Sequence, residues 1–340
     1  MKKLLNTLYI VDETSYLALD GENIVCKKEG EIKFRLPFTN IEEIVCFSYL
    51  GISPALMGKC TEMGIAMSFL TPEGQFLSRI QGKSRGNVLL RAAQYRLFAD
   101  PPPALRQNTV AAKLSNTRAL IRRTLRDYPQ LDDDGRLSGC IEYLEKGIES
   151  AYNTADTESL LGVEGNCAKA YFDIFNRLIL KQKDDFRITM RTKRPPLDRV
   201  NAALSFLYTI ATGSCAAALE SVGLDSYLGF YHAMRPGRCS LACDMVEEFR
   251  SSIDRLVLTM INLRQLTADD FETQPGGAVY LTKDGKRKVI SAWQEKKRTV
   301  IVHPYLKEKI PFGLLPFAQS SLLARYIRGE LEEYPCYLIK

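Results

Sequence analysis

The chain has 340 residues, of which 46% are hydrophobic and 25% are charged, so it is long enough to form one large domain or two unequal ones around a real core. Its 46 Lys and Arg residues exceed its 40 Asp and Glu residues only slightly, which permits nucleic acid as a partner without demanding it. No apolar run approaches the roughly 20 residues of a membrane-spanning helix. The N-terminal apolar run is broken early by Asn6 and Asp12, so we expect no signal peptide.

The first 82 residues are predicted to form a small β domain, similar to a β-sandwich. Asp20-Gly21 and Glu29-Gly30 are turn signals between short runs of strand-forming residues. Ser53, Pro54 and Gly64 have the residue types of a helix N-cap, first position and stop, and predict one helix within the domain. The expected strands are residues 7–11, 16–19, 24–27, 32–36, 44–47, 65–70 and 75–80.

After Gly82 the composition changes. Residues 83–90 are predicted to be a polar, basic linker, and residues 91–340 show mostly helical periodicity. A hairpin is expected at residues 279–289, with its turn at Asp284-Gly285. The fold class is therefore α+β, with the β domain followed by a larger, mostly α-helical domain.

Glu164 lies in the middle of the apolar side of a helix predicted over residues 160–180. An ionised carboxylate on such a face costs roughly several kcal/mol unless it is compensated. Glu164 must therefore be protonated, paired with Arg or Lys, bound to a cation, or turned to solvent at a local helix end beside Gly162 and Gly165. At helical spacing the apolar stripe around it contains Leu160, Leu161, Cys167, Ala168, Tyr171, Phe175 and Leu178.

A second group of candidate residues follows later in the chain. His232 lies in a Gly- and Pro-rich segment, and loops often carry functional residues. Ser240 is the expected N-cap of a helix on which Asp244 and Glu247 are neighbours. Carboxylates with one imidazole suit Mg²⁺ or Mn²⁺ better than zinc, although acidic residues on the outer face of a helix are more often simply solvated. The other histidine, His303, is expected to be structural.

The cysteines do not form a recognisable motif. Nine are scattered along the chain with no Cys-x-x-Cys pair, which is typical of reduced thiols in a cytoplasmic protein. Cys239 and Cys243 lie four residues apart with His232 upstream, but a closed zinc site needs better spacing and a fourth ligand.

Basic residues gather in three places, and a phosphate backbone is their natural partner. Solvated helix faces explain each cluster, taken singly, equally well. The first is the linker region, with Lys83, Arg85 and Arg91; the second has Lys181, Lys183, Arg187, Arg191, Lys193, Arg194 and Arg199; the third has Lys283, Lys286, Arg287, Lys288, Lys296, Lys297 and Arg298.

Four segments in order resemble a known family. They are LLGVEGNCAKAYF at 160–172, RPPLDRVNAALSFLY at 194–208, GFYH at 229–232 and RPGRCSLACDMVEEFR at 235–250. Together they resemble the CRISPR-associated integrase, the endonuclease of the spacer-acquisition module, in the form found with subtype I-C systems. The resemblance spans nearly the whole chain and implies the same two-domain organisation.

The resemblance also implies roles for individual residues. Glu164, His232 and Glu247 match the ligands of a catalytic Mg²⁺ or Mn²⁺, and Asp244 matches the acid that supports them. Many family members have Asp where this chain has Glu247, which has a longer side chain of the same charge. Glu248 is adjacent and competes with Glu247 for the ligand role. Several further residues are candidates for contacting DNA: Arg85, Tyr171, Arg191, Arg194, Tyr208 and Arg238, with Asn201 in a matching motif.

The implied function is the insertion of short double-stranded DNA fragments into CRISPR repeat DNA, by attack of a 3′-hydroxyl on a phosphodiester. The implied protein partners are a second copy of the chain, bound through the β domain, and a small second CRISPR-associated protein that bridges two dimers. A DNA-binding scaffold with a degenerate site would explain the basic clusters equally well. A phosphodiesterase acting on small substrates is a third alternative.

Overall fold

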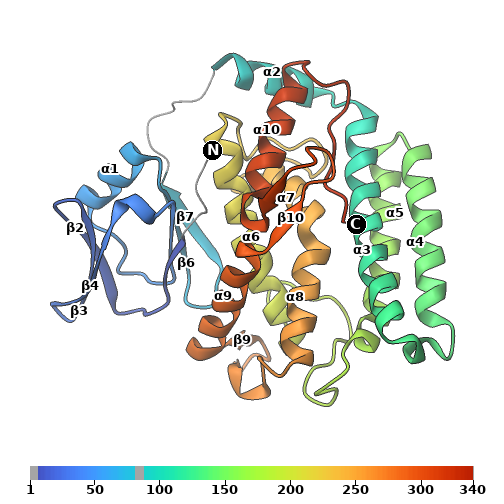
Figure 1. Cartoon of the computed structure of the whole chain (residues 1–340), viewed down its shortest axis with the longest axis horizontal. Coiled ribbons are helices and arrows are strands. Elements are labelled where there is room, and N and C mark those ends of the chain that lie inside the picture. The colour runs from blue at the N-terminus through green and yellow to red at the C-terminus, as the bar shows by residue number, and fades with distance from the viewer. Residues whose placement is uncertain (1–6, 81–87, 340) are drawn as a thin grey trace.

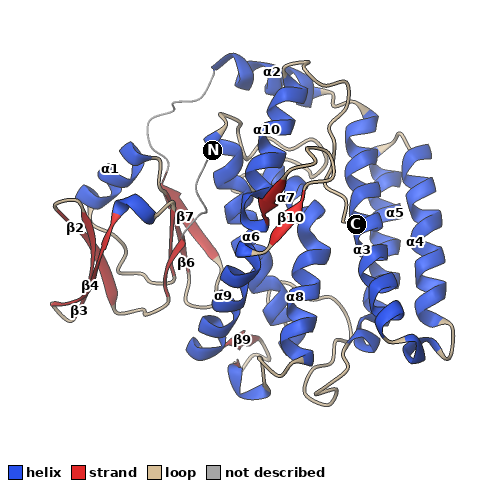
Figure 2. Ribbon diagram, in the orientation of Figure 1, coloured by secondary structure: helices blue, strands red, loops and turns tan. Residues whose placement is uncertain are grey.

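The computed structural model describes residues 7–80 and 88–339. The β domain lies at one end of the long axis of the molecule, and helices α3, α4 and α5 lie at the other (Figure 1). Strands are concentrated in the first part of the chain and helices dominate the rest (Figure 2). The predicted α+β class, with a β region followed by a mostly helical one, is confirmed.

The β domain contains two sheets and one helix. A four-stranded sheet has the order β1-β5-β6-β7, with β1, β5 and β6 parallel and β7 antiparallel to β6. An antiparallel sheet has the order β2-β3-β4. The elements are β1 (Thr7–Ile10), β2 (Ser15–Asp20), β3 (Asn23–Lys28), β4 (Glu31–Pro37), the 3₁₀ turn η1 (Phe38–Asn40), β5 (Glu43–Cys46), α1 (Pro54–Met63), β6 (Ala66–Leu70) and β7 (Phe76–Ile80).

Helix α1 begins and ends where its sequence predicts. The Ser53 hydroxyl accepts a hydrogen bond from the Leu56 amide at 3.3 Å, which satisfies one of the free N–H groups of the first turn. Gly64 ends the helix in the left-handed conformation, with a φ of 74°, which a residue without Cβ adopts at no steric cost.

Strand β5 is shared between two hydrophobic cores. Alternate residues of a strand point to opposite faces. Ile44 and Cys46 accordingly pack into the core of the β domain, whereas Val45 and the following Phe47 pack into the core of the helical domain. Phe47 stacks on Phe206 with ring centroids 5.4 Å apart. The four-stranded sheet therefore lies between the two hydrophobic cores. Because both of its faces are buried, a shift in strand register would expose apolar residues or bury polar ones.

The helical domain contains nine α-helices among the described residues. They are α2 (Val88–Ala99), α3 (Pro103–Asp127), α4 (Arg136–Asn153), α5 (Thr157–Ile174), α6 (Arg199–Ser221), α7 (Ser240–Val246), α8 (Arg250–Asn262), α9 (Lys283–Arg298) and α10 (Leu315–Ile327). Short 3₁₀ turns are η2 (Pro129–Asp132), η3 (Phe175–Leu178), η4 (Glu247–Phe249), η5 (Ala268–Asp270) and η6 (Phe312–Leu314), and the short strands are β8 (Phe271–Thr273), β9 (Val279–Leu281), β10 (Val300–Val302) and β11 (Lys309–Pro311).

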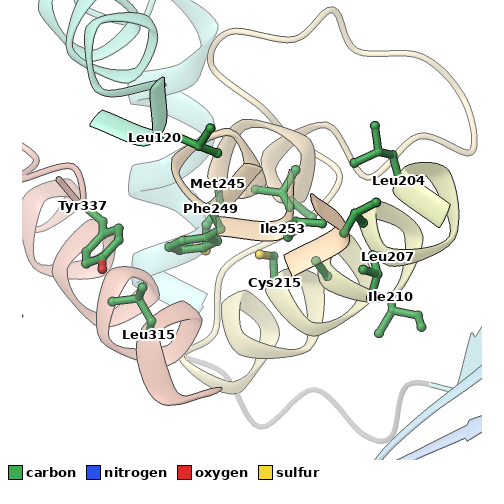
Figure 3. Packing of buried hydrophobic residues seen from close by; sticks show 14 of the residues in the cluster. Leu120, Leu204, Leu207, Ile210, Cys215, Met245, Phe249, Ile253, Leu315 and Tyr337 are labelled. Atoms are coloured by element: carbon green, nitrogen blue, oxygen red, sulfur yellow. The ribbon is translucent and has the colours of Figure 1, made fainter. Parts of the chain in front are cut away.

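Helix α6 is at the centre of this domain. It packs against α7, α8 and α10, and Figure 3 shows side chains of these helices gathered in one cluster, among them Leu207, Met245, Ile253 and Leu315. By length and composition α6 also passes as a possible membrane span, but most of its apolar window is buried inside the protein. Its apolar character is explained by its position in the core.

Three sequence-based boundaries are corrected by the structure. Residues 279–289 do not form a hairpin, because the Thr282 hydroxyl caps α9 and Asp284-Gly285 lies in its first turn; β9 instead pairs with β8. Ser240 is the first residue of α7 rather than its N-cap, since its hydroxyl donates to the carbonyl of Ala233 at 3.1 Å. The helix predicted over 160–180 ends at Ile174 and continues as η3.

The boundary between the domains remains in part a prediction. Helix α2 already begins at Val88, inside the predicted linker 83–90. The rest of that linker, including Arg85, lies outside the described residues.

Candidate active site

Five ionisable side chains from separate segments meet beside η4. Lys113 comes from α3, Glu164 from α5, His232 from the loop between α6 and α7, Asp244 from α7, and Glu247 from η4. Helix α3 brings the parts together, because it packs against α5, η4 and α8. The structure thus gathers all four residues singled out in the sequence, and adds a lysine that was not.

Glu164 is held between a cation and a hydroxyl. One carboxylate oxygen forms an ion pair with Lys113 Nζ, and the other accepts a hydrogen bond from the Tyr231 hydroxyl. Helix α5 runs unbroken past Gly162 and Gly165, so Glu164 is not turned to solvent at a helix end. Burial raises the pKa of Glu164, but Lys113 and Tyr231 outweigh this and hold the pKa below its usual value.

Glu247 is almost completely buried, with 2% of its side chain exposed. Arg250 Nη2 lies 2.9 Å from its Oε1, and Lys113 Nζ lies 2.7 Å from its Oε2. Burial raises the pKa of Glu247, and the charges of Arg250 and Lys113 lower it overall. The expectation that such an acid is simply solvated on an outer helix face is wrong, because α7 and η4 are covered on nearly all sides.

Asp244 fastens the loop that carries His232. Its Oδ2 accepts the backbone N–H groups of Phe230 at 2.8 Å and Tyr231 at 3.2 Å, and its Oδ1 accepts the backbone N–H of His232 at 2.8 Å. Gly229 makes this approach possible, since a Cβ there would lie 2.7 Å from Asp244 Oδ2. The fully buried carboxylate therefore sets the position of the whole loop.

The same carboxylate fixes the tautomer of His232. Asp244 Oδ1 lies 2.6 Å from His232 Nδ1, and an ionised carboxylate can only accept, so Nδ1 carries the proton. In a neutral imidazole with this tautomer Nε2 carries the lone pair, and Nε2 faces Glu247 Oε1 at 3.8 Å. This arrangement of carboxylate, imidazole and free ring nitrogen is the one that orients metal-binding histidines.

The donor set suits a divalent cation, but the present spacing does not form a finished metal site. Within residues 7–80 and 88–339, no group of three or more His, Cys, Asp and Glu side chains is close enough to hold a metal ion. The three side chains Glu164, His232 and Glu247 were expected to meet at metal-binding distance. They lie in one site, but not at that distance. The cause is Lys113, whose ammonium lies between the two glutamates.

Two observations nevertheless show that the site accommodates a cation. The ammonium already provides a positive charge between two carboxylates. In addition, Glu247 Oε2 forms no hydrogen bond despite its short distance to Lys113 Nζ, so that contact is ionic and not directional. Two carboxylates and one imidazole nitrogen are ligands that Mg²⁺ and Mn²⁺ accept.

A second buried polar group lies behind Glu247. Asp254 accepts hydrogen bonds from the hydroxyls of Tyr171 and Tyr208, and the guanidinium groups of Arg250 and Arg191 lie over the Tyr208 ring at 4.8 and 5.5 Å. Tyr171 is 4% exposed, so it has no surface to offer to DNA, contrary to expectation. Tyr208 and Arg191 are likewise engaged within the protein.

The remaining candidates for DNA contact differ in their surroundings. Arg194 is exposed and lines a polar cavity of about 280 Å³ between the β domain and α6, together with Ser205 and Thr209. Arg238 is half-buried beside the Cys243 thiol. Arg85 lies outside the described residues. Asn201 is fully buried and accepts a hydrogen bond from Arg191 at 2.6 Å.

The third basic cluster has a largely structural role. Lys283 pairs with Asp12 of the β domain at 2.9 Å and Lys288 pairs with Asp270 at 2.8 Å. Lys286 and Lys297 are buried. Four of the seven basic residues are therefore buried or paired within the protein, and phosphate binding by this cluster stays a prediction.

Lys113, Tyr231 and Arg250 were missed in the sequence. For Lys113 a signal was present. Val110, Leu114, Thr117 and Ile121 form the buried stripe of α3, and Lys113 lies on the same side at helical spacing. A cation on one apolar stripe and an acid on another predict a buried pair.

Comparison with known proteins identifies a family. A model of the family described as CRISPR associated protein Cas1 matches residues 8–295. The "CRISPR-associated endonuclease Cas1 1" of Chlorobaculum tepidum is 44% identical over 99% of both chains. The "CRISPR-associated endonuclease Cas1 2" of Rhodospirillum rubrum is 43% identical over 100% of both chains.

Solved structures share the fold. A "Casposase bound to integration product" superposes with a TM-score of 0.84 and 22% identity, covering 97% of this chain and 92% of that one. A Cas1 protein from Thermotoga maritima superposes with a TM-score of 0.78 and 20% identity, covering 97% and 99%. Since the family model spans most of the sequence and relatives above 40% identity cover nearly all of it, this chain belongs to the CRISPR-associated Cas1 family.

Proposed function

We propose that this chain is a metal-dependent DNA endonuclease and integrase of CRISPR adaptation. It joins the 3′-hydroxyl of a short double-stranded DNA fragment to a phosphodiester of CRISPR repeat DNA. The observation that carries the proposal is the convergence of Glu164 and Glu247 on one buried ammonium, with His232 Nε2 3.8 Å from Glu247 Oε1. Relatives named as endonucleases and a structural neighbour bound to an integration product support it.

Glu164, Glu247 and His232 would hold Mg²⁺ or Mn²⁺. Such an ion, when bound, stabilises the negative charge that develops on the phosphoryl oxygens and favours ionisation of the attacking hydroxyl. Glu247 is preferred to Glu248 as ligand, because only Glu247 faces Lys113 and His232.

The protein's own groups prepare this chemistry. Asp244 keeps the proton on His232 Nδ1, so Nε2 is available as a ligand or as a proton acceptor. Arg250 lies within 2.9 Å of Glu247 and limits the cost of burying its charge. Tyr231 orients Glu164 through a hydrogen bond to the oxygen that Lys113 does not contact.

DNA would be held mainly through its phosphates, without much reading of sequence. Arg194 at the polar cavity and Arg238 near the His232 loop are the candidates that remain among the described residues. Lys181, Lys183 and Arg187 are exposed and extend the basic surface. Arg85 is proposed on sequence alone.

Assembly with other proteins is also proposed. Homodimerisation through the β domain is supported by Tyr49 and Leu50, which are 72% and 56% exposed. A neighbour described as a "Cas6-RT-Cas1--Cas2 complex", with a TM-score of 0.82 over all of this chain, supports a small second CRISPR-associated protein as partner. We further propose a cytoplasmic protein that binds no membrane, and retain the resemblance to the subtype I-C form.

A DNA-binding scaffold without catalysis is the second candidate. It is favoured by one observation: the ammonium of Lys113 compensates the charges of Glu164 and Glu247. Such a protein binds DNA in a salt-sensitive manner but shows no turnover that depends on metal.

The test is strand joining in vitro. A short duplex and a supercoiled plasmid bearing the repeat are incubated with the protein and Mn²⁺, with and without the small partner. Glu164→Gln is expected to lower joining more than about a hundredfold, and chelation of the metal is expected to abolish it. Glu158→Gln is the matched control, since Glu158 is exposed on the first turn of the same helix.

Undiminished joining by a folded Glu164→Gln variant, or joining that survives chelation, would contradict the proposed site. Inactivity of the unchanged protein under all metal conditions, together with salt-sensitive binding of the duplex, would favour the scaffold.

A further inference from the structure

Lys113 is a buried lysine at the centre of the proposed site. Its side chain is 13% exposed, and its ammonium contacts Glu164 from α5 and Glu247 from η4. Both glutamates are at most 13% exposed. Two carboxylates drawn together in a low-dielectric environment repel each other unless a cation lies between them. Lys113 provides that cation.

The contact of Lys113 with Glu247 is an ion pair: Nζ lies 2.7 Å from Oε2, yet that oxygen forms no hydrogen bond. Lys113 is hydrogen-bonded to Glu164 instead. Arg250 contacts the other oxygen of Glu247 and lies over the Tyr208 ring. Lys113 can therefore move away while Arg250 still compensates Glu247. Its aliphatic arm also allows Nζ to withdraw while α3 stays in place.

We propose that Lys113 is the resident counter-ion of the metal site, and that its ammonium and a divalent cation compete for the same carboxylate oxygens. The metal binds only as Nζ withdraws from Glu164 and Glu247. This inference rests on the proposed function, because it presupposes that these oxygens bind a metal.

Charge balance gives the expected direction. Glu164 and Glu247 carry two negative charges, and Lys113 and Arg250, which contact them, balance these two charges. Carboxylates that are already compensated attract a dication weakly. Removal of the Lys113 charge leaves a net negative charge, which destabilises the metal-free protein and strengthens its attraction for Mn²⁺.

The experiment compares the unchanged chain with its Lys113→Met variant, which keeps most of the aliphatic side chain and removes its charge. Mn²⁺ binding is followed by calorimetry and by the electron paramagnetic resonance signal of free Mn²⁺. We expect the variant to bind Mn²⁺ at least about tenfold more tightly. We also expect a lower melting temperature without metal, and a larger rise on addition of Mn²⁺.

Lys297→Met is the matched control. Lys297 is also buried, and its Nζ donates to Thr7 at 2.8 Å in the contact between α9 and β1. This control is expected to lose stability without any change in Mn²⁺ affinity. Lys113→Gln replaces Lys113→Met if the latter does not fold, because an amide still donates a hydrogen bond to a carboxylate.

Two results overturn different parts of the proposal. Suppose that the unchanged protein binds Mn²⁺ in a manner that Glu164→Gln removes. Equal or weaker binding by the Lys113 variants then refutes competition and leaves the proposed function intact. If neither the unchanged protein nor the Lys113 variants show Mn²⁺ binding that depends on Glu164, the metal site fails, and the proposed function fails with it.

Discussion

Glu247 and Glu248 are adjacent on the same 3₁₀ turn, and both are buried, yet they face opposite regions of the molecule. Glu247 faces Lys113 and Arg250, which are cations. Glu248 faces the C-terminal segment, where it accepts hydrogen bonds at 2.6 Å from Gln319, from the Tyr334 hydroxyl and from the backbone N–H of Tyr337. None of these three donors carries a charge.

The pKa values of the two carboxyls are therefore shifted in opposite directions. Burial raises the pKa of Glu248 to about 7, because its neutral hydrogen-bond donors only partly offset desolvation. The pKa of Glu247 is lowered, because the charges of Arg250 and Lys113 outweigh the same desolvation. Two acids of nearly equal burial thus differ in charge through their partners. In the proposed site the ionised Glu247 would bind a cation, whereas Glu248 attaches the C-terminal segment.

The Glu248 region is an attachment point for the end of the chain. Asn116 of α3 reinforces it by donating to the carbonyls of Glu248 at 3.0 Å and Tyr337 at 2.8 Å, and by accepting from the Ile339 amide at 2.8 Å. His303 joins the same network through Gln319 at 2.9 Å, as expected of a structural histidine. Helix α3 therefore contributes to both regions, with Lys113 beside Glu247 and Asn116 beside Glu248, but only the Glu247 region contains cations.

The largest expected effect separates the two acids by activity. Glu247→Gln is expected to lower Mn²⁺-dependent strand joining more than about a hundredfold, because it removes a ligand charge from the proposed site. Glu248→Gln is expected to retain joining within about tenfold, since it only changes contacts to the C-terminal segment. The measurement is the initial rate of joining at saturating Mn²⁺, with melting temperatures as a check of folding. If Glu248→Gln is the more damaging of two folded variants, the assignment of ligand and attachment point is reversed.

A smaller effect is expected from Asp244→Asn. An amide presents only one acceptor oxygen, and its NH₂ group beside His232 Nδ1 favours the tautomer with the proton on Nε2. Loss of such an orienting carboxylate typically weakens metal binding or activity by about tenfold to a hundredfold. Measuring Mn²⁺ affinity distinguishes a loss of His232 orientation from a loss of the hydrogen bonds that hold the backbone of its loop. A folded variant with unchanged Mn²⁺ affinity would show that Asp244 only holds the backbone of the loop.

Whether a helix boundary or a site residue could be predicted from the sequence depended on how many faces of the helix are buried. The cap at Ser53 and the stop at Gly64 are local, and both were found. Glu164 was found because its helix has a clear apolar stripe. Helix α7 has no such contrast, since six of its seven residues are buried, and its acids were therefore expected on an outer face that does not exist.

Partners from distant segments could not be predicted in the same way. The start of α9 is set by one capping residue, Thr282, whereas the Asp284-Gly285 pair in its first turn is also typical of a hairpin turn. Lys113 lies 51 residues from Glu164 in the chain, so its place on the apolar stripe of α3 predicts a buried partner but does not identify it. The motifs identified the family and the acids, but which cation meets which acid is seen only in the fold.

The smallest expected effect is a pH dependence of stability. The pKa of Glu248 is raised above its unfolded value, so the folded state binds the extra proton. The stabilising contribution of this proton is complete below about pH 4.5 and is lost as the pH rises towards about 7. A glutamine at this position does not titrate. The free energy of unfolding of Glu248→Gln should therefore improve relative to the unchanged protein between pH 5 and pH 8, by at most a few kcal/mol.

Glu247→Gln provides the contrast within the same turn. The pKa of Glu247 is lowered from its ordinary value, so Glu247 is ionised in both the folded and the unfolded states throughout pH 5 to pH 8. The difference in melting temperature between Glu247→Gln and the unchanged protein should therefore stay constant from pH 5 to pH 8. Melting temperatures of the three proteins at half-unit pH steps test both statements. A constant offset for Glu248→Gln would mean that Glu248 stays ionised in the core, and that its three hydrogen bonds alone compensate its charge.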